Sequence, residues 1–317
     1  MLSDCPLLQV QHLFHSFPEK RGLLKQTVNS PPVLQDINLV IQPQEIVGLV
    51  GESGCGKSTL ARLLLRIYEQ TKGQIQFAGE DIHKYKAREY YRRVQMIFQD
   101  PFSSLNPKLR IGFLLREMWN LHQSESATTS KLKKLLDEVG LPANALDKYA
   151  HEFSGGQRQR IAIARALAAS PEMLVADEPV SALDVSIQAQ ILNLLKQLRK
   201  ERNLTLLFIS HDLTVVDQLC DRIFVLYRGR LMEELQKQQL DQARHPYTRL
   251  LLDSLPSYAK RETGLPIAPV EAEDAYIKGC PFVNRCSESQ AVCSQRVPQW
   301  SSLSKGHWAA CHAVKSS

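Results

Sequence analysis

Apolar runs and amphipathic stretches alternate along most of the chain. The amphipathic stretches carry apolar side chains at helical spacing, and the apolar runs are short and nearly continuous, as expected for strands buried on both faces. This alternation indicates an α/β fold in which helices cover both faces of a mainly parallel sheet. It predicts strands at residues 45–51, 93–99, 172–178, 204–210 and 222–229, and helices at residues 57–68, 156–170 and 185–202.

Two segments depart from the alternation. Residues 101–153 are polar-rich and helical in pattern with no clear strand, so we expect a helical subdomain inserted into the α/β core. Beyond about Glu233 the sequence contains many Pro, Ser and Gln residues, and we expect an irregular extension there. The predicted organisation is one core domain over residues 1–235 and an extension over residues 236–317.

Composition narrows the class of protein. The chain has 317 residues, of which 44% are hydrophobic and 23% are charged, and this balance is typical of a soluble globular protein. The first residues lack the features of a signal peptide, and no window approaches the roughly 18 apolar residues of a membrane span. We therefore expect a cytosolic chain. Its net charge of +6 comes from scattered Lys and Arg, which favours a solvated surface over a nucleic-acid partner.

The motif GESGCGKST, at residues 51–59, is the strongest chemical signal. It satisfies the pattern G-x-x-x-x-G-K-[ST] between a predicted strand and a predicted helix, which is the context of a phosphate-binding loop. The glycines let backbone N–H groups point inward at a helix N-terminus, and the lysine can reach the β- and γ-phosphates. The sequence therefore predicts binding of ATP and Mg²⁺ by Gly51, Ser53, Gly54, Gly56, Lys57, Ser58 and Thr59.

Two carboxylates end the predicted strand MLVADE. They lie at the carboxyl edge of the sheet, where ligands bind in α/β folds. Asp177 is suited to hold Mg²⁺, and Glu178 is suited to orient or deprotonate the water that attacks the γ-phosphate. A carboxylate pair at a strand end can also cap a helix. The pair indicates a catalytic site only because the phosphate-binding loop occurs in the same chain.

A second cradle of N–H groups follows at Ser154, Gly155, Gly156 and Gln157, where SGGQ begins a predicted helix without a leading strand. One nucleotide needs one cradle. We therefore expect the second cradle to bind the nucleotide of another protomer.

With these motifs the chain resembles the ATP-binding subunits of ABC transporters over at least residues 7–235. The series IFQDP, SGGQ, VADEP, SALD and ISHD follows the phosphate loop in order. The resemblance implies a RecA-like P-loop core with an antiparallel β subdomain and a helical subdomain, and two subunits that sandwich two ATP molecules. It also implies that Gln99 contacts Mg²⁺ and the attacking water and that His211 contacts the γ-phosphate. Asp184 would link the two ATP sites across the dimer, and an aromatic residue would stack on adenine. Phe17 is the candidate for that residue, with Phe14 as the alternative.

The segments HPYTRLLLDSLP and GCPFVNRC extend the resemblance to ATPases of the oligopeptide/dipeptide/nickel importer subfamily. This implies ATP hydrolysis that drives uptake of peptides or a related solute such as nickel. The implied partners are a second ABC ATPase, with a heterodimer favoured over a homodimer, two transmembrane permease subunits and, indirectly, an extracytoplasmic binding protein. The implied location is the cytoplasmic face of the cell membrane, as a peripheral subunit. The alternative is a soluble ABC ATPase of DNA repair or translation.

Four of the seven cysteines lie near the carboxyl end with the spacing C-x5-C-x6-C-x17-C. A cytosolic chain favours metal ligation or free thiols over disulfides. Four thiolates can hold a [4Fe–4S] cluster, as in some subfamily members, or Zn²⁺. The candidate ligands are Cys280, Cys286, Cys293 and Cys311, with His307 and His312 in reserve.

Cys55 lies within the phosphate loop itself. A nest of N–H groups should lower the pKa of its thiol. The sequence thus suggests that alkylation of this thiol blocks ATP hydrolysis and that bound ATP protects it.

Overall fold

The computed structural model describes residues 5–21, 26–100, 105–253 and 278–314. Residues 101–104, at the start of the predicted helical subdomain, and residues 254–277, within the predicted extension, lie outside this described part. None of the described helices is both long and apolar enough to span a bilayer.

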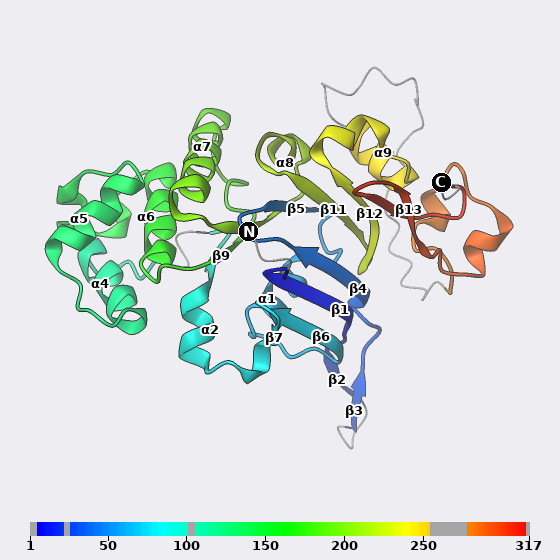
Figure 1. Cartoon of the computed structure of the whole chain (residues 1–317), viewed down its shortest axis with the longest axis horizontal. Coiled ribbons are helices and arrows are strands. Elements are labelled where there is room, and N and C mark those ends of the chain that lie inside the picture. The colour runs from blue at the N-terminus through cyan, green and yellow to red at the C-terminus, as the bar shows by residue number, and fades with distance from the viewer. Residues whose placement is uncertain (1–4, 22–25, 101–104, 254–277, 315–317) are drawn as a thin grey trace.

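A mixed sheet forms the centre of the molecule (Figure 1). Its strand order is β13-β14-β12-β11-β5-β10-β9-β8, and the last five strands in this order run parallel to one another. The five predicted strands correspond to these parallel strands, so the expected sheet is confirmed. Its members are β5 (Ile46–Val50), β8 (Val94–Ile97), β9 (Met173–Asp177), β10 (Thr205–Ser210), β11 (Arg222–Tyr227), β12 (Arg230–Gln236), β13 (Trp300–Ser304) and β14 (His307–Ala310).

A second sheet is antiparallel and lies below the central sheet in Figure 1. Its order is β4-β1-β6-β7, and a separate hairpin pairs β2 with β3 in the long stretch that precedes β4. This agrees with the expected antiparallel subdomain. The strands are β1 (Leu8–His15), β2 (Pro18–Arg21), β3 (Gln26–Asn29), β4 (Leu34–Ile41), β6 (Lys72–Phe77) and β7 (Glu80–Asp81).

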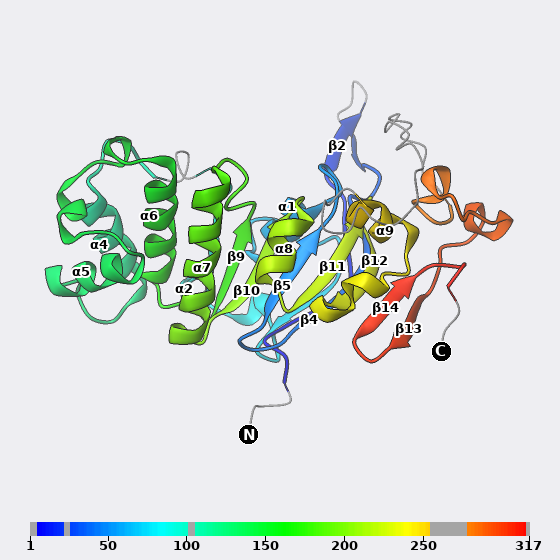
Figure 2. The same ribbon diagram turned by 90° about the horizontal axis from the view of Figure 1, so that it is seen from above.

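Helices cover both faces of the central sheet (Figure 2). One core packs the central sheet against α6, α7, α8 and α9 and continues into the helical region, and the other packs it against α1 and the antiparallel sheet. The α-helices are α1 (Lys57–Leu64), α2 (Ala87–Arg93), α4 (Ile111–His122), α5 (Thr129–Glu138), α6 (Gly155–Leu167), α7 (Val185–Arg202), α8 (Leu213–Leu219) and α9 (Pro246–Asp253). The short 3₁₀ helices are Ile82–Lys84, Ala143–Asp147, Ala150–Glu152, Lys237–Gln242, Val283–Arg285 and Ala291–Ser294.

The end of the chain differs from the irregular extension that the sequence suggested. Strand β14 pairs with β12 through Glu233 and Glu234, and β13 continues the sheet outward. Phe282 is buried in the same core as α9. The prediction failed because β13 and β14 are short and neither has a clear strand pattern. They are stabilised by pairing with a distant strand edge rather than by their own sequence.

Candidate nucleotide-binding and catalytic site

Several of the predicted site residues meet at the carboxyl edge of the central sheet. Gly51 follows β5, Asp177 ends β9, His211 follows β10, and Gln99 lies just beyond β8. These four strands are parallel neighbours, so their carboxyl ends lie at one edge. This is the edge at which α/β folds bind ligands.

The phosphate loop connects β5 to α1 through backbone that only glycine adopts readily. Gly56 has a φ of 110° at the N-cap of α1, and a Cβ on Gly51 would lie 2.1 Å from the carbonyl oxygen of Leu226. The Lys57 ammonium is buried and donates to the carbonyl oxygens of Gly51, at 2.7 Å, and Glu52, at 2.9 Å. Ser53 and Gly54 are exposed at the tip of the loop. The loop is therefore an anion nest at a helix N-terminus, with a cation beside it.

Oxygen donors suited to Mg²⁺ lie next to this loop. The Ser58 hydroxyl donates to the Asp177 carboxylate at 3.2 Å, which joins α1 to the end of β9. Burial raises the pKa of Asp177, and the Ser58 hydrogen bond opposes that shift in part. Hard oxygen ligands of this kind are those that Mg²⁺ prefers. Thr59, the next residue of α1, is partly exposed.

Glu178 lies between two of the other predicted residues. Its Oε2 atom is 3.3 Å from Gln99 Nε2 and 3.1 Å from His211 Nδ1. Its backbone has a φ of 47°, in the left-handed region that is unusual for a residue other than glycine. Strained backbone of this kind is frequent in active sites. Gln99, Glu178 and His211 thus form one cluster next to Ser58 and Asp177.

The second cradle begins α6 on a different part of the core. The Ser154 side chain accepts from Gln157 N, and the Gln157 side chain accepts from Ser154 N, which makes a capping box. Ser154, Gly155 and Gln157 are exposed, whereas Gly156 is buried against Ile187 of α7. Asp184 is the exposed N-cap residue of α7. Both helix starts are therefore accessible to a second molecule.

The two aromatic candidates for adenine stacking lie in different surroundings. Phe17 contacts His15 and Tyr68 edge-on, at ring-centroid distances of 4.7 and 5.3 Å. His15 pairs with Leu34, whose side chain touches the phosphate loop at Gly56. Phe14 instead lines a cavity of about 530 Å³ with Trp300 of β13. Phe17 thus lies on the side of the phosphate loop, and Phe14 faces the carboxyl-terminal strands.

The expectation that the nest lowers the pKa of the Cys55 thiol is wrong. The side chain is buried, and burial raises the pKa of the thiol, although the Lys57 charge and local backbone hydrogen bonds lower it in part. The nest has too small an effect to offset the loss of solvent around the sulfur. The thiol therefore lacks the thiolate character that rapid alkylation requires.

The four carboxyl-terminal cysteines are free thiols. Burial raises the pKa of Cys280 to about 11 and also raises the pKa of Cys286 and Cys311, and the neighbouring cysteines raise each further. The thiols are therefore close enough to influence one another. Nevertheless, no group of three or more His, Cys, Asp or Glu side chains in the described part of the chain is arranged to hold a metal.

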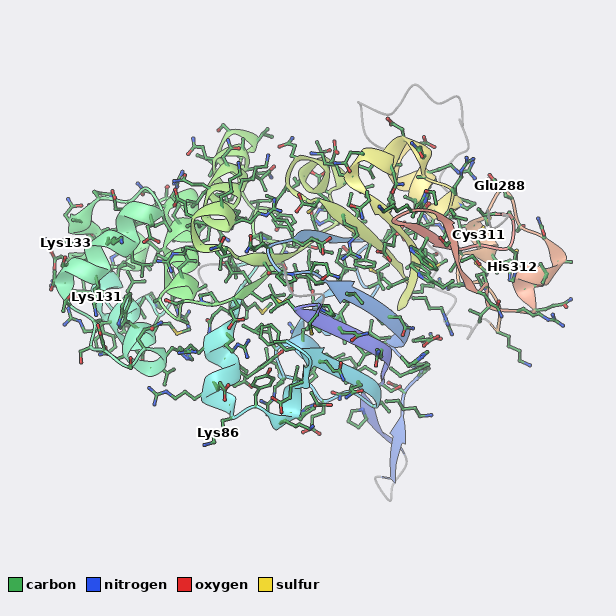
Figure 3. All side chains as sticks on the ribbon, in the orientation of Figure 1. Lys86, Lys131, Lys133, Glu288, Cys311 and His312 are labelled. Carbon is green, nitrogen blue, oxygen red and sulfur yellow. The ribbon has the colours of Figure 1, made fainter. Side chains whose placement is uncertain are left out.

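The two histidines considered as reserve ligands have other partners. His307 Nε2 contacts Glu233 at 2.7 Å, and His312 Nε2 donates to the carbonyl oxygen of Arg296 at 2.9 Å. Figure 3 labels Cys311 and His312 at the carboxyl-terminal end of the molecule. The structure thus gives no support for an iron–sulfur or zinc centre with the side chains in these positions.

Sequence reasoning missed three residues that contact the phosphate loop or lie within it. Glu52 belongs to the loop. The Tyr247 hydroxyl, on α9, accepts a hydrogen bond from the backbone N–H of Glu52, and Arg285 of the carboxyl-terminal segment pairs with the Glu52 carboxylate. The segment HPYT, which contains Tyr247, was the available signal. Arg285 is separated from Glu52 by 233 residues, so no local pattern links the two.

The chain is similar to known proteins along almost its whole length. The ABC transporter family matches residues 34–181, and the C-terminal region of oligopeptide/dipeptide transporters matches residues 232–293. The oligopeptide transport ATP-binding protein AppF of Bacillus subtilis is 42% identical, and the match covers 96% of this chain and 97% of that protein. A putative peptide import ATP-binding protein of Brucella ovis, BOV_A0347, is 44% identical, with 98% of each chain covered.

Two solved structures have a similar fold. The ATP-binding cassette MJ0796, a dimer in a post-hydrolysis state bound to ADP and Pi, has a TM-score of 0.61 and 26% identity, over 73% of this chain and 98% of that one. CbiO1 of Clostridium perfringens, part of the ABC transporter complex cbiONQ, has a TM-score of 0.63 and 24% identity, over 80% of this chain and 97% of that one. The chain is therefore an ATPase and belongs to the ATP-binding subunits of the oligopeptide/dipeptide branch of ABC transporters.

Proposed function

We propose that the chain hydrolyses ATP to drive uptake of peptides, or of a related solute such as a nickel chelate, by an ABC importer. The observation that carries this proposal is the cluster of Gln99 and His211 around Glu178, next to the Ser58–Asp177 pair. The solute assignment is supported by relatives that are named oligopeptide or peptide import proteins. These names do not favour the alternative role in DNA repair or translation.

The proposed division of roles follows the positions of the side chains. Lys57 would neutralise the β- and γ-phosphates of ATP. Ser58 and Asp177 would hold Mg²⁺, which would supply further positive charge to the phosphates. Glu178 orients or deprotonates the attacking water, because its carboxylate is directed toward Gln99 and His211 rather than into the core. Gln99 relays the state of the site to the permease, and His211 contacts the γ-phosphate.

Replacement of Glu178 by Gln tests this assignment. The variant should bind ATP but lose at least about a hundredfold in turnover, since a positioned general base contributes 10²–10⁴-fold. Glu172→Gln is the matched control, because Glu172 lies just before the amino end of β9 and pairs with Arg93. Release of phosphate by the reconstituted transporter is the measurement. Robust hydrolysis by Glu178→Gln would refute the proposed role.

We further propose that the active unit is a dimer with a second, different ABC ATPase. In that dimer Ser154, Gly155 and Gln157 contact the partner's nucleotide, and Asp184 lies at the contact between the sites. Support comes from the exposure of these residues and from Val185, which is 82% exposed at the start of α7. Light scattering with Glu178→Gln and ATP tests the proposal. Association only when the second ATPase is added supports a heterodimer, and self-association supports a homodimer.

A groove near Gln99 is the proposed permease-docking surface. It has a volume of about 370 Å³ and is lined by Phe98, Leu121 and Ala162, among other residues. Phe98 precedes Gln99 directly, so a permease segment in this groove would be adjacent to the catalytic cluster. Exposed apolar side chains such as Leu121 are typical of interaction sites. Docking here would hold the subunit at the cytoplasmic face of the membrane, while the extracytoplasmic binding protein contacts only the permease.

Two residues of α4 give a matched test of this surface. Leu121 is 53% exposed in the groove, and Phe113 is 54% exposed on the same helix but outside the groove. Leu121→Asp should abolish co-purification with the permease without changing ATP binding, and Phe113→Asp should retain it. Equal retention by both variants would place the docking surface elsewhere.

We retain the [4Fe–4S] cluster, with Zn²⁺ as the alternative, as a proposal for Cys280, Cys286, Cys293 and Cys311. It is supported by their spacing and by the hydrogen bond from Cys280 N to the carbonyl oxygen of Cys293, at 2.7 Å, which brings two of these residues together. Binding would require the thiolates to draw together from their present positions. Iron, acid-labile sulfide and zinc analysis of anaerobically purified protein is the test. A preparation with none of the three would refute both metals.

A further inference from the structure

We propose that Arg285 is a positioning residue for the ATP site, which it controls through Glu52 of the phosphate loop. The carboxyl-terminal segment that bears the cysteines would thereby set the affinity for ATP. This inference rests on the proposed role of the phosphate loop, and it assigns to the carboxyl-terminal segment a function beyond its own stability.

The ion pair between Arg285 and Glu52 is bidentate. Arg285 Nη1 donates to Glu52 Oε2 at 2.8 Å, and Arg285 Nη2 donates to Glu52 Oε1 at 2.9 Å. The Arg285 side chain is 11% exposed and that of Glu52 is 33% exposed. A bidentate, charge-assisted pair that is mostly shielded from water fixes the orientation of both side chains. It is therefore stronger than an ordinary surface ion pair.

Glu52 connects this pair to the phosphate-binding atoms. Its backbone N–H donates to the Tyr247 hydroxyl at 2.9 Å, so α9 holds the same residue from a second direction. Its carbonyl oxygen accepts from Lys57 Nζ at 2.9 Å and from Cys55 N at 3.3 Å. A change in the position of Glu52 would thus move the acceptor of the phosphate-binding lysine.

Arg285 is itself held on a platform of aromatic rings. Its guanidinium lies 5.8 Å from the ring centroid of Tyr227 and 5.7 Å from that of Phe282. The Phe282 ring packs against both Tyr227 and Tyr247, at 5.3 Å from each. Cys280, two residues before Phe282, donates its backbone N–H to the carbonyl oxygen of Cys293 at 2.7 Å. The cysteine-bearing segment is therefore in continuous contact with the phosphate loop.

Electrostatics give the direction of the effect. The Glu52 carboxylate belongs to the loop that receives the ATP phosphates, and an unpaired negative charge there would repel them. The Arg285 guanidinium neutralises that charge and holds it against the aromatic platform. Loss of Arg285 should therefore weaken ATP binding. It should leave turnover of the ATP-saturated enzyme nearly unchanged, because neither residue contacts Gln99, Glu178 or His211 in the described contacts.

Titration of the full-length chain with a fluorescent ATP analogue and Mg²⁺ tests the inference, together with steady-state ATPase assays of the assembled transporter. Arg285→Ala should raise the Kd and KM by about tenfold, in line with loss of a charge-assisted hydrogen-bond pair. Arg285→Lys keeps the positive charge but cannot form the bidentate hydrogen bonds, so its Kd for ATP should lie between those of the unaltered chain and Arg285→Ala. Addition of Glu52→Gln to Arg285→Ala should bring the Kd back toward that of the unaltered chain.

Arg249→Ala is the matched control. Arg249 of α9 pairs with Glu288 of the carboxyl-terminal segment and so fastens that segment without contacting the phosphate loop. The Kd of Arg249→Ala for ATP should equal that of the unaltered chain. An unchanged Kd in Arg285→Ala, or an equal change in Arg249→Ala, would overturn the inference. Lys57→Ala distinguishes this from failure of the proposed ATP site, because retained binding in that variant would mean that the phosphate site itself is wrongly assigned.

Discussion

Glu178 shows how backbone conformation directs a side chain at the end of a strand. Its left-handed backbone costs roughly 1–3 kcal/mol for a residue with a Cβ. The backbone N–H of Glu178 is fixed by the carbonyl oxygen of Ile209 on the neighbouring strand at 3.0 Å. This turn directs the carboxylate toward Gln99 and His211 instead of continuing the strand. Strain at this residue is therefore part of how the cluster is assembled.

Alkylation of Cys55 should be slow, because its thiol is buried and burial raises its pKa. Cys5 is exposed and should react first with iodoacetamide. Peptide mass spectrometry over time, in parallel with ATPase assays, measures both events. We expect activity to persist after Cys5 is modified and to decline only as Cys55 reacts. Modification of Cys55 as fast as Cys5 would contradict the buried environment.

His245 should make the protein less stable in mild acid. It is almost fully buried. Its ring Nδ1 accepts from the backbone N–H of Tyr247, and the backbone N–H of His245 donates to the Glu233 carboxylate. Burial lowers its pKa to about 4 from 6.5, although the Glu233 charge raises it and the Arg249 charge lowers it further. The unfolded chain thus binds the proton more readily. The stabilisation is complete above about pH 6.5 and falls by about 3 kcal/mol as the pH approaches 4.

Urea denaturation at several pH values checks this prediction. His245→Asn offers an uncharged acceptor in the same place, so its free energy of unfolding should depend less on pH between about 6.5 and 4. His15 and His122 are also buried with lowered pKa values, so the comparison of the two proteins isolates the contribution of His245. Identical acid slopes would contradict the prediction.

At the scale of elements, local patterns predicted the parallel sheet and three of the helices that flank it, α1, α6 and α7. These segments have apolar runs of the right length, and the helix starts at Lys57 and Ser154 are marked by glycine-rich motifs. The pairing of β14 with β12 was not predicted, because Trp308 and Ala309 have no pattern that identifies their partner. That pairing depends on an edge provided by residues more than 70 positions away.

The candidate site was predicted in its parts because each part lies in a short motif next to a strand end. The sequence order of the motifs also specified that Ser58, Asp177 and Glu178 would meet, since parallel strands share one carboxyl edge. The contact of Arg285 with Glu52 could not be predicted, because it depends on the aromatic platform that seats the carboxyl-terminal segment. Cys55 was misjudged because burial is a property of the folded core.

Gly48 lets helix α8 approach strand β5 closely. A Cβ at this position would lie 2.5 Å from Val216 Cγ1 and 3.1 Å from Cys220 Sγ. Gly48→Ala should therefore destabilise the protein by about 1–3 kcal/mol through overpacking. Val216→Ala in the same chain should recover part of this loss by making room. Thermal denaturation of the single and double variants measures both effects, and a Gly48→Ala protein as stable as the unaltered one would contradict the close contact.

At the scale of the whole molecule, the ATP site lies between two regions with different proposed roles. The helical region that carries α4 and α5, with Lys131 and Lys133, lies at one end, and the segment with Glu288 and Cys311 lies at the other (Figure 3). The proposed permease groove is adjacent to Gln99, and the carboxyl-terminal segment contacts Glu52. ATP affinity and permease coupling can therefore be altered independently.

A chain that ends at Asp253 tests how much the carboxyl-terminal segment contributes. The truncation exposes the edge of β12, removes Phe282 from Tyr227 and Tyr247, and leaves the fully buried Glu233 without His307. Loss of the Phe282 ring alone should cost about 3–5 kcal/mol. We therefore expect a much lower melting temperature, measured by calorimetry, together with the weakened ATP binding of Arg285→Ala.

The comparison of these two proteins separates stability from affinity. Arg285→Ala keeps β13, β14 and Phe282, so its melting temperature should fall far less than that of the truncated chain, while its Kd for ATP should rise to a similar extent. If the truncated chain had the same melting temperature as the full-length protein, the carboxyl-terminal strands would not stabilise the core. Unaltered ATP affinity in the truncated chain would show that Glu52 needs no partner, because the loop would then be held by Tyr247 alone.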